Sequence, residues 1–121
     1  MQTPLNPIAD LETLREIALR HGYDGHAALV GELLTRAAKD RQAIWGALNT
    51  IDVWGGAGSV ADIALGAMSR LPDAQVRADE FRWRNALISL SIGMHENGIS
   101  NSRAQSWAET FQAWNDARNG I

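Results

Sequence analysis

The chain has 121 residues, of which 45% are hydrophobic, and its formal net charge is −3. This length and composition indicate one globular domain over residues 1–121 and exclude an intrinsically disordered chain. The mild acidity disfavours general binding to nucleic-acid phosphates, so no nucleic-acid partner is expected. The sequence contains no cysteine, which excludes a disulfide framework and a thiolate metal site.

The opening residues and the apolar stretches indicate where in the cell the protein is expected. Residues 1–7 have neither the basic start nor the apolar run of a signal peptide. Residues 53–71 form the longest weakly polar stretch, but aspartate, arginine and glycines interrupt it, so it does not suit a bilayer. We therefore expect a cytoplasmic protein without a membrane partner.

The first expected helix covers about residues 7–21. Asn6 suits the N-cap, Pro7 suits the first helical position, and Gly22 suits a position just past the end. Apolar residues recur inside this segment at helical spacing, and they are Leu11, Leu14, Ile17 and Ala18.

Residues 24–50 are also helical in pattern, and they leave two interpretations open. Asp24 could cap a second helix, and a third helix could begin near Asp40, with Ile44 and Leu48 on its apolar face. The same pattern fits one long kinked helix equally well. The sequence does not separate these alternatives.

A glycine-rich turn then interrupts the helical pattern. Ser59 and Asp62 have the spacing of a capping box, which predicts a tight turn followed by a helix over about residues 60–71. A glycine-rich loop before a helix can also present backbone N–H groups to an anion, although the lysine of a phosphate-binding loop is missing. The candidate ligand-binding residues are Gly55, Gly56, Gly58, Ser59 and Asp62.

The next helix is expected over about residues 74–97, between Pro72-Asp73 and the Asn97-Gly98 stop. It carries two apolar stripes, one formed by Val76, Trp83, Leu87, Leu90 and Met94, and the other by Phe81, Ile88 and Ile92. A helix with two apolar faces is covered on two sides, so we place it at the centre of a bundle. Asp73, Asp79 and Glu80 near its start are explained by the helix dipole.

The last helix is expected after a cap at Ser100 or Asn101. Trp107, Phe111 and Trp114 share one of its faces at spacings of three and four residues. This stripe predicts either the docking face of the helix or an exposed face for a partner or a second copy, so a homodimer is possible. These three residues are the candidate partner-binding residues.

No pattern of catalytic or metal-binding residues stands out. His21, His26 and His95 lack the spacing of a zinc site. We therefore expect no metal, no cofactor and no enzymatic activity.

Residues 54–65 resemble a family of small bacterial all-helical proteins of unknown function. That family carries an aromatic-Gly-Gly-Met-Gly-Ser-Phe-Asn-Asp-Leu-Val-Leu segment between two helical pairs, and the likeness extends loosely over residues 10–98. Ala57 replaces the methionine, and Val60-Ala61 replaces Phe-Asn. The matching residues are Gly55, Gly56, Gly58, Ser59 and Asp62. The resemblance implies a helical fold and no particular activity.

These observations predict an all-α protein, a compact bundle of five to six helices. By analogy with other small acidic helical proteins, we expect a protein-binding module, most concretely an immunity protein or antitoxin that inhibits a toxin by direct binding. Mild acidity would steer it toward a basic partner. The alternative is a small-molecule or anion-binding protein, possibly an enzyme, that uses the turn at residues 55–59 with Asp62. A deep pocket beside that turn would favour the alternative.

Overall fold

The computed structural model describes residues 5–56, 58–67 and 69–119, and the side chains up to residue 117. Every regular element in this part of the chain is helical, and six of them are α-helices, which confirms the predicted all-α fold. In chain order the elements are α1 (Pro7–Arg20), α2 (Asp24–Lys39), α3 (Ile44–Ala47), α4 (Ile51–Trp54), η1 (Val60–Asp62), η2 (Leu65–Ala67), α5 (Asp73–Glu96) and α6 (Ser102–Asn119).

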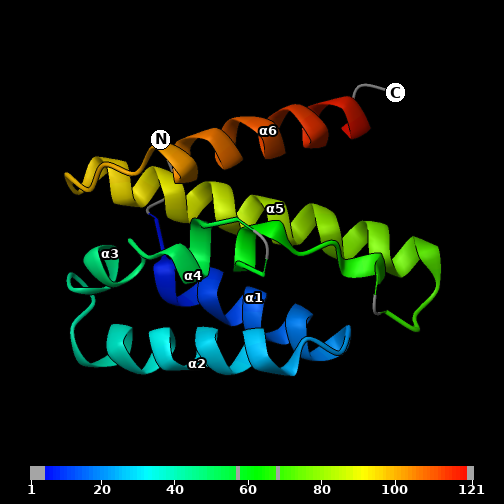
Figure 1. The fold of residues 1–121 in the computed structure, drawn as a ribbon, viewed down its shortest axis with the longest axis horizontal. Helices are drawn as coiled ribbons and strands as arrows, with labels where there is room; N and C mark the ends of the chain where they lie inside the picture. Colours follow the sequence, from blue (N-terminus) through cyan, green and yellow to red (C-terminus); the bar gives the residue numbers. More distant parts are fainter. Residues whose placement is uncertain (1–4, 57, 68, 120–121) are drawn as a thin grey trace.

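The four long helices lie side by side and alternate in direction along the row α2, α1, α5 and α6 (Figure 1). Helix α5 packs against α1 on one side and α6 on the other, so its predicted central place is confirmed. One of its predicted stripes is only partly covered, since Ile88 is 9% exposed and Ile92 is 44% exposed. The segment from α3 to η2 crosses one face of this row, in green in Figure 1.

The ends of α1 follow the sequence signals. The Asn6 side chain accepts a hydrogen bond from the Ala9 backbone N–H at 3.1 Å, and Pro7 begins the helix. Gly22 follows the helix with a φ of 87°, a left-handed conformation that favours glycine. The prediction that Asp24 caps α2 is wrong: Asp24 is the first helical residue, and the cap position is held by Tyr23.

The structure also separates the two interpretations of residues 24–50. Helix α2 ends at Lys39, and the Asp40 carboxylate then accepts hydrogen bonds from the backbone N–H groups of Gln42 and Ala43 at 3.1 and 3.3 Å. These bonds stabilise a turn instead of a continuing helix. The short helices α3 and α4 follow, so the segment is not one kinked helix.

In the described parts of residues 60–71, namely 60–67 and 69–71, the predicted helix does not form, and the capping box is missing as well. Two single 3₁₀ turns, η1 and η2, take its place. The Ser59 hydroxyl donates to the Gly55 carbonyl at 2.5 Å, so it stabilises the end of α4 instead of the start of a new helix. Asp62 lies inside η1, where no side-chain cap forms. Gly55 suits this junction because a Cβ there would lie 2.4 Å from the Ile51 carbonyl oxygen.

Three of the five tryptophans fill the core, since Trp45, Trp54 and Trp83 are 7%, 1% and 2% exposed. Trp45 from α3 packs against α5 where Gly93 leaves room for its ring. A Cβ on Gly93 would lie 2.2 Å from that ring, so this glycine is required by packing. Within the described ranges, no helix is long and apolar enough to cross a membrane.

Candidate functional site

A pocket of 170 Å³ opens between residues 61–64, α5 and α6, and we call it the α5–α6 pocket. It brings together two features that the sequence placed apart, Asp62 after the glycine turn and the aromatic stripe of α6. Its side-chain walls are Glu80, Trp83 and Arg84 from α5 and Trp107, Phe111 and Trp114 from α6.

Helical spacing explains why these side chains converge. Positions 80, 83 and 84 are three and four residues apart, and so are positions 107, 111 and 114, which puts each set on one helix face. Helix α6 is fixed at its start because the Asn101 side chain accepts a hydrogen bond from the Ala104 N–H at 3.0 Å. The predicted cap at Ser100 or Asn101 is thereby resolved as Asn101.

Aromatic rings form the α6 wall of the pocket. Trp107 and Phe111 are stacked, with ring centroids 5.1 Å apart and planes at 25°, and the Phe111 and Trp114 centroids are 5.8 Å apart. The Trp107 indole N–H donates to the Trp54 carbonyl at 3.2 Å, which ties α6 to α4. Phe111 is 3% exposed and Trp114 is 49% exposed, so Phe111 docks α6 onto the bundle while Trp114 is half exposed to solvent.

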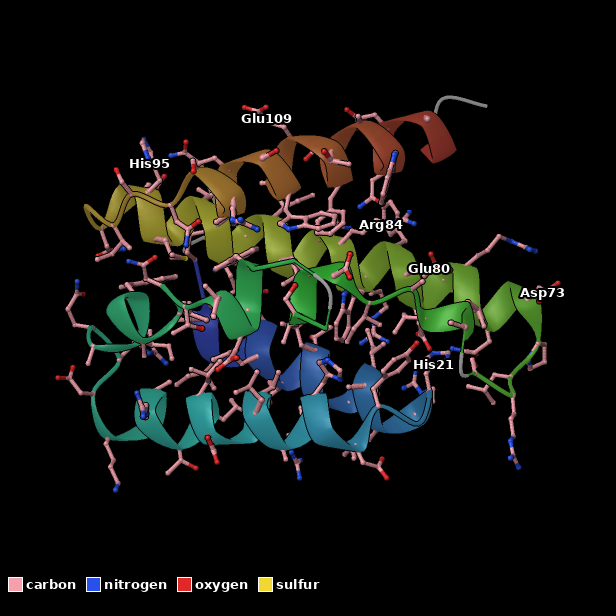
Figure 2. All side chains as sticks on the ribbon, viewed as in Figure 1. His21, Asp73, Glu80, Arg84, His95 and Glu109 are labelled. Carbon is pink, nitrogen blue, oxygen red and sulfur yellow. The ribbon has the colours of Figure 1, made fainter. Side chains whose placement is uncertain are left out.

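The Arg84 guanidinium is held in place by three neighbours. It donates to Glu80 at 2.9 Å and to the Asn115 side-chain oxygen at 3.5 Å, and it lies over the Trp114 ring at 5.1 Å from the centroid. Asn115 is only 2% exposed, and its amide donates to Asn85 at 3.0 Å. Figure 2 shows Glu80 and Arg84 on the half of α5 that begins at Asp73, beside the overlying α6.

The α5 wall contains a buried hydrogen-bond donor that lacks a partner. Trp83 is 2% exposed, and its indole N–H donates to no group among the described residues. A buried donor without an acceptor costs about 1–3 kcal/mol, so such groups call for an explanation. The apolar periodicity of α5 predicts a buried Trp83 but not its unpaired N–H, because periodicity indicates which face a residue occupies and not whether its polar atom has a partner.

The remaining candidate residues of the glycine turn lie outside this pocket. Ser59 is 3% exposed and its hydroxyl bonds to the Gly55 carbonyl. The Gly58 carbonyl accepts a hydrogen bond from His26 at 2.9 Å, and Gly58 has a φ of 88°. Gly56 faces open space, since a Cβ there would meet nothing within 4 Å. Of the five ligand candidates in the turn, Asp62 alone is among the residues that line the α5–α6 pocket.

A second polar cluster is buried where the end of α1 meets α5. Asp79 is 1% exposed, and its carboxylate accepts two hydrogen bonds from Arg20 at 2.8 Å, one from His21 at 2.7 Å and one from Gln75 at 3.1 Å. The other His21 ring nitrogen lies 2.6 Å from the Ser69 hydroxyl. The prediction that the helix dipole explains Asp79 is therefore wrong, because this carboxylate is a buried ion-pair partner.

The charge of Asp79 determines the hydrogen bonding of the cluster. Burial raises the pKa of Asp79, but the hydrogen bonds from Arg20, His21 and Gln75 outweigh it and lower the pKa to about 2. An ionised carboxylate only accepts, so His21 donates to it through Nε2. In the neutral ring, Nδ1 then accepts from the Ser69 hydroxyl.

This chain of Ser69, His21 and Asp79 has the residue types of a hydrolase triad. However, the hydroxyl bonds to Nδ1 and the carboxylate to Nε2, the reverse of the usual arrangement. The His21 side chain is fully buried, and the Ser69 oxygen also accepts from the Leu71 N–H at 3.1 Å. We interpret the cluster as a clamp that fixes the segment before α5 to the end of α1, near His21 in Figure 2.

Comparison of the chain with protein-family models, curated proteins and solved structures gives no match. The resemblance of residues 54–65 to a family of small helical proteins therefore stays a prediction. In the described ranges, no group of three or more His, Asp or Glu side chains is placed to hold a metal ion.

Proposed function

We propose that this protein binds a small molecule in the α5–α6 pocket. The observation that carries the proposal is the lining of the pocket, in which the rings of Trp107, Phe111 and Trp114 face the Arg84 guanidinium and the carboxylates of Glu80 and Asp62. Aromatic faces attract other rings and cations, so this lining suits a small planar ligand. A small-molecule-binding protein was the alternative that the sequence left open. Of the residues predicted for that role, Asp62 stays a candidate, and the glycines of the turn are structural.

The dimensions of the pocket support a ligand of one ring. The volume is 170 Å³, and an apolar cavity of about 150 Å³ is large enough for benzene. Sites for larger, drug-sized ligands usually have volumes of about 300–1,000 Å³. Trp114 lines the pocket and is 49% exposed, so this part of the lining is open to solvent.

Nuclear magnetic resonance tests this proposal directly, because the five tryptophans give five indole N–H signals. The Trp83 signal is assigned as the one that disappears in Trp83→Phe. We expect single-ring fragments to shift the Trp83 signal, because Trp83 lines the pocket. The Trp54 signal is the matched control, because that indole already donates to the Leu48 carbonyl at 3.0 Å. A fragment collection that leaves the Trp83 signal unmoved would refute the proposal.

A protein-binding role is the second candidate, and Trp114 is the observation that favours it. This side chain is 49% exposed and stacks with Arg84, and tryptophan and arginine dominate binding hot spots. In this interpretation the protein is a cytoplasmic immunity protein or antitoxin, and its partner is a toxin domain. Co-expression with the product of a neighbouring gene tests it: the protein should abolish toxicity, and Trp114→Ala should weaken that protection. Equal toxicity with and without this protein would exclude the role.

A further inference from the structure

We infer that the ligand of the α5–α6 pocket is a small planar organic cation, such as a protonated heteroaromatic ring or an aromatic amidinium. The inference rests on the proposed function and names the ligand class for the same site. Three observations support it: the way the chain holds a cation of its own in this pocket, a second carboxylate that stays unpaired, and the aromatic wall.

The chain already holds one planar cation in this pocket. The Arg84 guanidinium lies over the Trp114 ring at 5.1 Å from the centroid, and it donates to the Glu80 carboxylate at 2.9 Å. The Arg84 side chain is only 21% exposed, so these contacts form largely out of water. An aromatic face and a carboxylate both favour a positive charge. The same two kinds of group occur a second time in the lining of the pocket.

The second carboxylate belongs to Asp62. It lines the pocket and forms no hydrogen bond or ion pair with any other described residue. The charged groups of the lining are thus one cation and two carboxylates, of which Arg84 and Glu80 neutralise each other. Coulomb attraction needs no direct contact and extends over about 10 Å at 0.1 M salt, so the Asp62 charge acts across the pocket. It attracts a cationic ligand and repels an anionic one.

The second aromatic surface belongs to Trp107 and Phe111. Their rings line the pocket nearly parallel to each other, at 25°, and the cation–π contact of Arg84 is with Trp114 and not with them. Ring faces attract cations and gain further contact area from flat ligands. A planar cation with one ring fits the volume of 170 Å³, since about 150 Å³ is large enough for benzene.

Benzamidine, benzamide and benzoate test the ligand class. All three consist of a benzene ring with a planar substituent of similar size, and at neutral pH they are positive, neutral and negative. We expect benzamidine to bind about tenfold more tightly than benzamide, and benzoate to bind most weakly, as measured from the indole N–H shifts of Trp83, Trp107 and Trp114. Added salt should weaken the binding of benzamidine and leave that of benzamide unchanged.

Asp62→Asn isolates the unpaired charge, and it breaks no side-chain contact among the described residues. Benzamidine should lose about threefold in affinity, benzoate should gain, and benzamide should be unaffected. The matched control is Glu32→Gln, which makes the same change in net charge on α2, at the opposite end of the helix row from α6 (Figure 1). It should leave all three affinities unchanged, because a distant exposed charge is screened.

Arg84→Gln tests the same idea by a gain of binding. It removes the cation of the chain and frees Trp114 and Glu80 for a ligand. Benzamidine should then bind several-fold more tightly than to the wild type, and benzoate more weakly. If Arg84→Gln does not fold, Asp62→Asn and the ranking of the three probes on the wild-type protein decide.

The outcomes separate the ligand class from the proposed function. Benzamide or benzoate binding as tightly as benzamidine would overturn the cationic class and leave the pocket as a binding site. An equal affinity of benzamidine for Asp62→Asn and Glu32→Gln would overturn the attraction by Asp62. No shift of the Trp83 signal with any probe or fragment would overturn the proposed function itself.

Discussion

Replacing Asp79 by asparagine tests whether the buried cluster at the end of α1 stabilises the fold. The variant keeps the shape of the side chain and removes the negative charge of the carboxylate that accepts hydrogen bonds from Arg20 and His21. We expect Asp79→Asn to destabilise the protein by about 3 kcal/mol. Removal of one partner from a buried ion pair costs about 3–5 kcal/mol. The lower end applies because the Arg20 side chain is 30% exposed and keeps its pairing with Glu16.

Urea unfolding at pH 7, followed by far-ultraviolet circular dichroism, measures this loss. A change of 3 kcal/mol is a large share of the roughly 5–15 kcal/mol that stabilises a typical domain, and it lowers the melting temperature by about 10 °C. The matched control is Asp73→Asn, an exposed acid in the first turn of the same helix, which should cost less than about 1 kcal/mol. Equal stability of the two variants would refute the clamp interpretation.

The pH dependence provides a second measurement of the same charge. The pKa of Asp79 is lowered to about 2 in the folded protein, from its usual value of 3.8. Because the folded pKa is the lower one, this stabilisation is fully present above pH 4 and is lost as the pH falls toward 2. The difference in stability between the wild type and Asp79→Asn should therefore shrink by about 2 kcal/mol from pH 5 to pH 2. A stability difference that stays constant from pH 5 to pH 2 would contradict the lowered pKa of Asp79.

Other predictions follow from packing and from the glycine turn. Gly93→Ala should lower the free energy of unfolding by about 1–3 kcal/mol, because the new methyl group would overlap the Trp45 ring. The control is Gly46→Ala, which has open space around it and should not destabilise the protein. Equal urea midpoints for the two variants would show that the core adapts to the methyl group. Ser59→Ala should cost about 1 kcal/mol through loss of its hydrogen bond to Gly55, as measured by thermal unfolding. Asp62→Ala should change the free energy of unfolding by less than about 0.5 kcal/mol, because Asp62 caps no helix. A loss above about 1 kcal/mol would show that Asp62 does act as a cap.

Much of the fold could be predicted because helix signals are local. Asn6, Pro7 and Gly22 define the ends of α1 through backbone groups only a few residues away. The apolar stripe of α5 predicted its central position, since a helix covered on two sides needs apolar residues on two faces. The same local logic failed after Gly58, where Ser59 and Asp62 have the spacing of a cap but the Ser59 hydroxyl bonds backward to Gly55.

The candidate site could be predicted only in part. Asp62 and the aromatic stripe of α6 were identified as candidates from their types and spacing, but their meeting in one pocket depends on how α6 packs on α5. Trp83 and Arg84 gave no separate signal, because a buried tryptophan and a helical arginine are ordinary features of a bundle. Whether the Trp83 N–H finds an acceptor depends on atoms distant in sequence.

By itself, the sequence determined the extents of α1 and α5 and most of their buried positions, because caps and apolar periodicity act over a few residues. Only the tertiary structure decided which groups pair with the Asp79 carboxylate. Its position near the start of α5 fits a role in the helix dipole, yet the packing of α1 places Arg20 and His21 around it at 2.7–2.8 Å. Those partners lie 59 and 58 residues away along the chain, and only the packed bundle brings them to the buried carboxylate.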